Sequence, residues 1–222
     1  MNRRTASVLT TGLALALAAS LTACGGDDSG KKTDDEAVKG AEPAKSSAEA
    51  SPSPSASKAG AERPKIELPA DLKYNFEWPK TGDKKKDAVM ADAEQRIKAV
   101  DLAISHQDPE DPAYRFYSEG EAAAGSEDFI KLFTADSDTI TGYRHFYKPV
   151  VQLNDDGTAG FVYCEDQATA YNKKIKTGKV EKTQPSKNSY VVYNTRLRLD
   201  DDRGVWVTEK LISQRGSATC QP

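Results

Sequence analysis

All 17 aromatic residues of this 222-residue chain lie at or after Tyr74. A folded core needs large apolar side chains, because their burial offsets the entropy lost when the chain is ordered. Between residues 25 and 62 the chain has one large aliphatic residue, Val38, among Gly, Ser, Ala, Pro and charged residues, with a Ser-Pro run at residues 51–55. This composition predicts a disordered linker, followed by one folded domain over residues 63–222.

The first 23 residues have the three parts of an export signal. Two arginines precede an apolar, uncharged run over residues 6–19, which is shorter than the roughly 20 residues that span a membrane. The segment Leu21-Thr22-Ala23-Cys24 closes the signal and resembles the bacterial lipobox. That resemblance implies cleavage before Cys24 and a diacylglycerol on its thiol. An ordinary signal peptide that ends near a cysteine is the alternative.

The lipobox resemblance predicts where the domain works. Residues 1–23 would be a lipoprotein signal peptide, and residues 24–62 would be the lipidated cysteine and its linker. Two acyl chains anchor a protein stably, whereas one binds only marginally. We therefore expect a lipid anchor on Cys24, at the extracytoplasmic face of the cell membrane. The formal net charge of −3 argues against a nucleic-acid partner, which attracts a clustered basic face.

Two cysteines remain once Cys24 carries lipid. An even number of cysteines in an exported chain favours a disulfide, here between Cys164 and Cys220. Such a bridge would be structural and would be worth roughly 4 kcal/mol on the chain-entropy model. Two separate thiols are the alternative.

The folded part begins with helical patterns. One apolar stripe recurs at helical spacing after Asp83, a residue that can cap a helix start. Its members are Val89, Ala93, Ile97, Val100 and Ile104. Pro109 and Pro112 end this helix, a second helical piece begins near residues 111–112, and a third runs from Ser126 to about Asp136.

Strand patterns follow from Thr139 onward. A turn at residues 154–157 separates one predicted pair of strands, and residues 190–199 and 205–212 form a second pair. In the second pair we expect Leu199 opposite Val205 and a cation–π contact between Arg198 and Trp206. Helices followed by antiparallel strands give an α+β order.

This order resembles the nuclear-transport-factor-2-like (NTF2-like) cone fold, including its SnoaL and ketosteroid-isomerase-like branch. Residues 163–167 and 205–208, with Arg215, Gly216 and Cys220, are also similar to small secreted lipoproteins of actinobacteria. The resemblance covers about residues 83–220. It implies N-terminal helices packed on a curved antiparallel sheet, with a pocket between the two layers. It also implies that the domain could form a homodimer through the sheet as an alternative to a monomer.

Strand alternation selects the candidate pocket residues. They are Tyr143, His145, Tyr147, Tyr163 and Glu165. A Tyr hydroxyl beside a carboxylic acid could polarise a carbonyl, as the ketosteroid-isomerase resemblance implies. The alternative is that the tyrosines pack the sheet. Two histidines without metal-ligand spacing predict no metal, and no nucleotide or phosphate motif predicts a cofactor.

These observations predict a tethered, non-catalytic binding or accessory module. The alternative is a small-ligand binder or an acid–base enzyme that uses the pocket. A binder of a small apolar ligand should show an apolar pocket lined by both helix and sheet. A protein-interaction module should instead show a filled cone and an exposed apolar patch.

Overall fold

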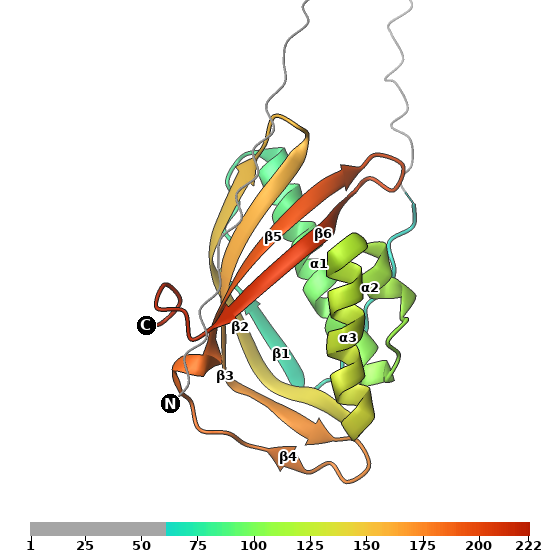
Figure 1. Ribbon diagram of the computed structural model, residues 1–222, viewed down its shortest axis with the longest axis vertical. Helices are drawn as coiled ribbons and strands as arrows, with labels where there is room; N and C mark the ends of the chain where they lie inside the picture. Colours follow the sequence, from blue (N-terminus) through green and yellow to red (C-terminus); the bar gives the residue numbers. More distant parts are fainter. Residues whose placement is uncertain (1–60) are drawn as a thin grey trace, which may run out of the picture. The chain divides into compact units, whose positions relative to one another are not determined.

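The computed structural model describes residues 61–222 (Figure 1). The expected signal peptide, Cys24 and the linker up to residue 60 lie outside the described residues. The elements are β1 (Leu72–Phe76), α1 (Lys84–His106), α2 (Pro112–Phe116), α3 (Gly120–Asp136), β2 (Asp138–Leu153), β3 (Thr158–Lys174), β4 (Val180–Glu181), a 3-10 turn (Lys187–Ser189), β5 (Tyr190–Asp200) and β6 (Val205–Arg215). The predicted α+β class is confirmed. No helix in this part of the chain is long and apolar enough to cross a membrane.

The first helix follows the sequence pattern closely. Asp83 caps α1, where its carboxylate accepts the backbone N–H groups of Lys85 and Lys86 at 2.8 and 3.3 Å. All five members of the apolar stripe are buried. The third helix differs from the prediction, since it begins at Gly120 and not at Ser126. The three alanines that precede Gly125 favour helix strongly enough to extend it toward the N-terminus.

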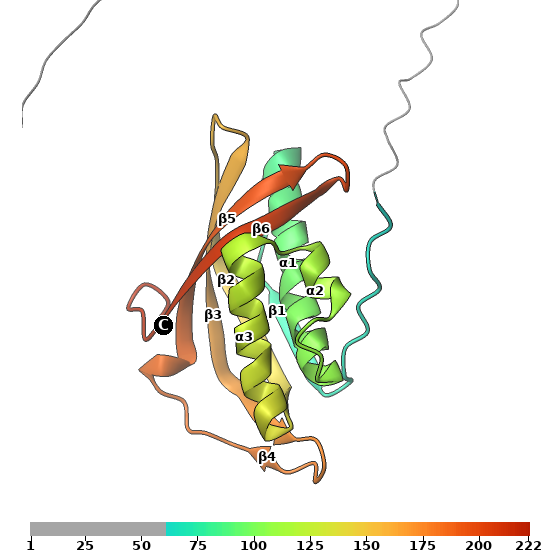
Figure 2. The same ribbon diagram turned by 45° about the vertical axis from the view of Figure 1, so that its right-hand side comes forward.

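The sheet has the strand order β1-β2-β3-β5-β6, with β4 paired to β3. Strand β1 pairs parallel to β2, with Tyr74 opposite Arg144, so the expectation of an all-antiparallel sheet is wrong in this respect. The chain leaves β1 through three helices before it returns as β2, and such a crossover connection permits parallel pairing. Figure 2 shows that α1, α2 and α3 all lie on one side of the sheet, and we call the face on that side the inner face.

The sheet is curved and unclosed, and a glycine marks one bend. The pairing of β2 with β3 shifts register just after Tyr143. Gly142 has φ +100°, and a Cβ at this position would lie 2.1 Å from the carbonyl oxygen of Thr169. Only glycine fits this conformation and this close approach. The curvature leaves room between the sheet and the helices.

The β5–β6 hairpin has a different register from the prediction. Asp200 pairs with Val205 and Leu199 with Trp206. The turn explains the difference. The N–H of Gly204 donates to the carbonyl of Asp200 at 2.7 Å, so the turn is one residue shorter than predicted and Asp200 becomes part of the paired strand. Arg198 does not stack on Trp206; its guanidinium donates to Glu119, the residue before α3, at 2.7 Å.

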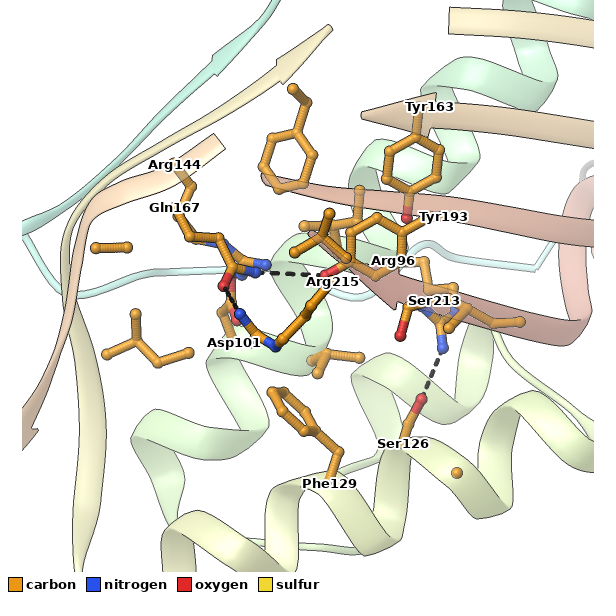
Figure 3. A pocket seen from close by; sticks show the side chains of 18 of the residues that line it. Arg96, Asp101, Ser126, Phe129, Arg144, Tyr163, Gln167, Tyr193, Ser213 and Arg215 are labelled. Carbon is orange, nitrogen blue, oxygen red and sulfur yellow. Dashed lines mark hydrogen bonds and ion pairs between the residues drawn. The ribbon is translucent and has the colours of Figure 1, made fainter. Parts of the chain in front are cut away.

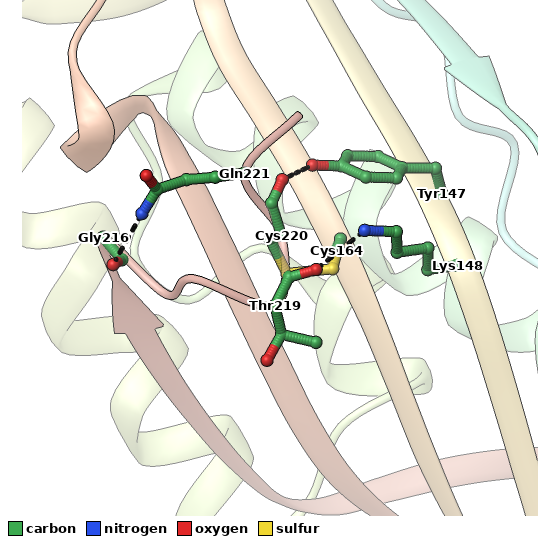
Figure 4. Close-up of a disulfide and its surroundings, with 7 residues drawn as sticks. All are labelled: Tyr147, Lys148, Cys164, Gly216, Thr219, Cys220 and Gln221. Carbon is green, nitrogen blue, oxygen red and sulfur yellow. Dashed lines mark hydrogen bonds between the residues drawn. A yellow bond between two sulfur atoms is a disulfide. The ribbon is translucent and has the colours of Figure 1, made fainter.

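A disulfide joins Cys164 to Cys220, as the sequence predicts, with a Cα–Cα distance of 5.5 Å. It ties the C-terminal segment to β3 on the side of the sheet away from the helices (Figure 4). Two neighbours on β2 hold the same segment. Tyr147 donates its hydroxyl to the carbonyl of Cys220, and the Lys148 ammonium donates to the carbonyl of Thr219 at 2.8 Å. The last residues are therefore fastened to the outer face of the sheet.

Candidate functional site

A cavity of about 500 Å³ lies between the helices and the inner face of the sheet. This volume falls within the range of about 300–1,000 Å³ that is typical of small-molecule sites. Its walls combine apolar and polar side chains from both layers, and the apolar side chains extend across the whole lining. They include Ile97, Val100, Phe129, Phe146, Val191 and Leu211. The cavity is therefore lined as the sequence analysis required of a ligand-binding pocket.

The cavity opens between α3 and the end of β6. The lining residue Phe129 of α3 is 41% exposed. Ser213 and Arg215 of β6 also line the cavity and are exposed. Arg215 is held at this opening, where Nη1 donates to Oε1 of Gln167 at 2.9 Å. A ligand can thus reach the interior past one aromatic and one cationic side chain.

A row of polar side chains crosses four adjacent strands on the inner face. Tyr74, Arg144, Glu165 and Tyr193 belong to β1, β2, β3 and β5, and Asp101 belongs to α1 in the helix layer. Figure 3 shows three of these residues, Arg144, Tyr193 and Asp101, around the cavity. Nε of Arg144 donates to Glu165 Oε1 at 2.5 Å, and its Nη1 donates to Asp101 Oδ2. The hydroxyls of Tyr193 and Tyr74 donate to Glu165 Oε2 at 2.8 Å and to Asp101 Oδ2 at 2.7 Å. One guanidinium thus joins two buried carboxyl groups.

Burial and the neighbouring charges set the protonation of this row. Burial raises the pKa of the Asp101 carboxyl, and the charge of Glu165 adds to this against the opposing charge of Arg144. Burial disfavours the Arg144 charge, but Asp101 and Glu165 outweigh it and raise its pKa well above the ordinary value. Burial also raises the pKa of Tyr193, with a further contribution from Glu165. Tyr193 therefore stays a hydrogen-bond donor near neutral pH.

Arg96 of α1 lines the same cavity and is 7% exposed. Its Nε donates to the hydroxyl of Ser118 at 2.9 Å, and its Nη2 donates to the hydroxyl of Ser126 at 2.6 Å and to the carbonyl of Ala122 at 3.5 Å. All of these acceptors are neutral. Within residues 61–222, Arg96 forms no ion pair, and burial lowers the pKa of its guanidinium.

The structure separates the five sequence-predicted pocket residues into two groups. Tyr163 lines the cavity, and Glu165 is fully buried in the polar row beside it. Tyr143, His145 and Tyr147 do not line it, which corrects the expectation for these three. They form a ladder of rings on the outer face, with centroids 6.5 and 5.0 Å apart. Strand alternation correctly predicts that these three side chains share one face of β2. It does not predict which face is buried, because both faces of β2 carry aromatic residues.

The charged residues of the cavity were not among the candidates that the sequence pattern predicted. Arg144 alternates with the outer-face ring ladder of β2 and so points inward with Phe146. Arg96 and Asp101 flank members of the apolar stripe of α1, and both are buried. Charged residues beside an apolar stripe are a signal that could have pointed to these two, since such residues are rarely buried without a partner.

Three solved structures resemble the domain in comparisons of structure. Aln2 from a Streptomyces species matches with a TM-score of 0.42 and 14% identity, over 61% of this chain and 94% of that one. A ketosteroid isomerase-like protein from Erwinia carotovora atroseptica matches at 0.39 and 13%, over 61% and 98%. The intermembrane space region of the chloroplast protein ARC6 matches at 0.36 and 10%, over 62% and 99%. No protein-family model and no curated protein sequence matches the chain. With TM-scores below 0.5, these likenesses indicate nothing about function.

Proposed function

We propose that this chain is a membrane-tethered, non-catalytic lipoprotein whose NTF2-like domain binds a small, largely apolar ligand. The observation that carries this proposal is the cavity of about 500 Å³ between helices and sheet, with apolar side chains in its walls and an opening at Phe129. Fixed polar groups in an apolar pocket orient a ligand and provide selectivity. Here the polar row is bonded within itself, so it is organised before a ligand arrives.

The cavity favours a ligand binder over a protein-interaction module. An interaction module of this fold has no need of a cavity between its layers, because its partner contacts the surface. Apolar wall area in an open cavity is exposed to water, which is unfavourable until a ligand covers it. A ligand that fills the cavity would cover its apolar side chains and contact the buried charged groups beside them, and this accounts for both features of the lining.

The uncharged dye Nile red tests whether the cavity is a binding site. Leu211 lines the cavity, whereas its neighbour Ile212 is 60% exposed. We expect the unchanged chain to bind one dye molecule with a rise in fluorescence. Leu211→Trp fills the cavity and should abolish binding, and Ile212→Trp is the matched control that should retain it. Equal binding by the two variants would refute the site.

The anchoring part of the proposal rests on the lipobox resemblance around Cys24 and on the linker composition. The expected lipid holds the domain at the membrane, and the linker gives it reach. In cells, Cys24→Ser should move the protein from the membrane fraction to the soluble extracytoplasmic fraction. A Cys24→Ser chain that is still processed and membrane-bound would overturn this part alone.

One observation favours acid–base catalysis as a second candidate function. Asp101 lines the cavity, its pKa is raised by burial, and its Oδ1 has no hydrogen-bond partner among residues 61–222. Such a carboxyl group could exchange a proton with an enolisable ligand. The test is isomerisation of a β,γ-unsaturated ketone by the unchanged chain and by Asp101→Asn. Equal rates for the two would remove the enzyme candidate.

A further inference from the structure

Two of the guanidinium groups that line the cavity, those of Arg96 in α1 and Arg144 in β2, are largely buried but differ in how their charge is balanced. Arg144 bonds two carboxyl groups, Asp101 and Glu165. Arg96 is similarly buried but bonds only two hydroxyls and one carbonyl. A buried charge is costly unless it is paired. The charge of Arg96 therefore lacks a counter-ion within the described part of the chain.

Arg96 also has an unused donor. Its Nε and Nη2 donate to Ser118, Ala122 and Ser126, whereas Nη1 has no hydrogen-bond partner within residues 61–222. Figure 3 shows the guanidinium bonded to Ser126 at the wall of the cavity. The neutral acceptors hold the guanidinium plane in place, and Nη1 remains available to a molecule in the cavity.

A second unused donor lies near the first. The hydroxyl of Tyr163 has no hydrogen-bond partner among the described residues, although its side chain is 2% exposed and lines the cavity. Its ring stacks on Tyr193 with centroids 5.0 Å apart, which fixes its direction. Burial raises the pKa of Tyr163, and the nearby charge of Arg96 opposes this. The hydroxyl is therefore a neutral donor close to the unpaired cation.

We propose that the ligand carries a carboxylate, which accepts from Nη1 of Arg96 and from the hydroxyl of Tyr163, with its apolar body against Ile97 and Phe146. This inference rests on the proposed function. Among residues 61–222, Arg96 is the buried cavity-lining guanidinium without an ion pair, and its charge balances one negative charge. Arg215 also lines the cavity but is exposed at its opening, where it donates to Gln167 and to the carbonyl of Asn188. A doubly charged phosphate would bring excess negative charge close to Asp101 and Glu165, so a carboxylate fits the site better.

Calorimetric titration of the full chain with matched probes tests the charge of the ligand. The probes are decanoate and 1-decanol, 4-phenylbutyrate and 4-phenylbutanol, and decylammonium. A hydrogen bond to a charged group stabilises a complex more than one between neutral groups. We therefore expect each carboxylate to bind about ten to a hundred times more tightly than its alcohol. Decylammonium should not bind, since its charge has the sign of Arg96.

Variants assign this preference to the two donors. We expect Arg96→Gln to reduce carboxylate affinity about ten- to a hundredfold and to leave alcohol affinity unchanged. Tyr163→Phe should reduce it less, and Arg96→Lys should keep part of the preference. The control is Arg196→Gln, which removes a 55%-exposed guanidinium outside the cavity and should change nothing. Alcohol binding shows that each variant is folded, and if Arg96→Gln does not fold, Arg96→Lys and Tyr163→Phe decide.

The outcomes separate this inference from the proposed function. Alcohols that bind as tightly as carboxylates, or a carboxylate preference that survives both Arg96→Gln and Tyr163→Phe, would overturn the inference and leave ligand binding intact. If neither Nile red nor any of the matched probes binds the unchanged chain, the proposed function fails together with the inference.

Discussion

Replacement of Arg144 by Met tests the polar row most severely. The substitution removes the only cation that pairs with Asp101 and Glu165 within residues 61–222, and these side chains are 1% and 0% exposed. Breaking a buried ion pair by removing one partner costs about 3–5 kcal/mol, because it leaves a buried charge uncompensated. Total stabilities are typically about 5–15 kcal/mol, so a large part of the free energy of unfolding should be lost.

The loss should depend on pH in a definite direction. The pKa of Asp101 is already raised by burial, and without Arg144 it rises further. A carboxyl group whose folded pKa lies above its unfolded value contributes stability at low pH and loses it as the pH rises through the folded pKa. Urea denaturation should therefore show a small deficit for Arg144→Met near pH 4 and a larger one near pH 7.

A surface arginine is the control for this prediction. Arg196→Met removes a 55%-exposed guanidinium that faces Asp156 at 3.3 Å and Glu209 at 3.5 Å. Exposed ion pairs are worth about 1 kcal/mol or less, so this variant should stay close to the unchanged protein at every pH. Equal losses for Arg144→Met and Arg196→Met, or a deficit for Arg144→Met that does not change with pH, would refute the interpretation of the row as a charge-balanced cluster.

Three further variants test the scaffold, each by urea denaturation. Replacing Cys164 and Cys220 by Ser removes a crosslink between residues 56 positions apart, which should lower the free energy of unfolding by up to about 4 kcal/mol; no loss would mean that the bridge does not stabilise the fold. Gly142→Ala puts a Cβ against Thr169 at φ +100° and should cost at least about 2 kcal/mol, whereas a neutral result would argue against the bend. Asp83→Ala removes the cap of α1 and should cost about 1 kcal/mol; an effect on ligand affinity instead of stability would contradict its role.

Local chemistry made much of the fold predictable from the sequence. The cap at Asp83 and the stripe through Ile97 define α1 because each depends only on neighbours in the same helix. The disulfide followed from the even number of remaining cysteines and from the expectation that the chain is exported. Strand β1 was missed because five residues before a helix carry little periodicity, and its partner β2 is far away in the chain.

The site was less predictable than the fold because it depends on which face of each strand is buried. Tyr163 and Arg144 meet the same cavity from neighbouring strands, but their pairing depends on register and on the bend at Gly142. The β5–β6 register likewise depended on one turn residue, Gly204. A register shift of one residue moves every side chain of a strand to the opposite face of the sheet. A small error in the predicted register is therefore enough to assign the wrong residues to a site.

The most direct test of the account is a crystal structure of the protein soaked with 10-bromodecanoate, in which the anomalous signal of bromine locates the apolar end. Ligand binding in the cavity predicts a bromine peak within the apolar walls near Val100 and Phe146, with the carboxylate at Arg96 and Tyr163. A bromine peak on the outer face beside Tyr143, or a cavity that stays empty at saturating ligand, would contradict it.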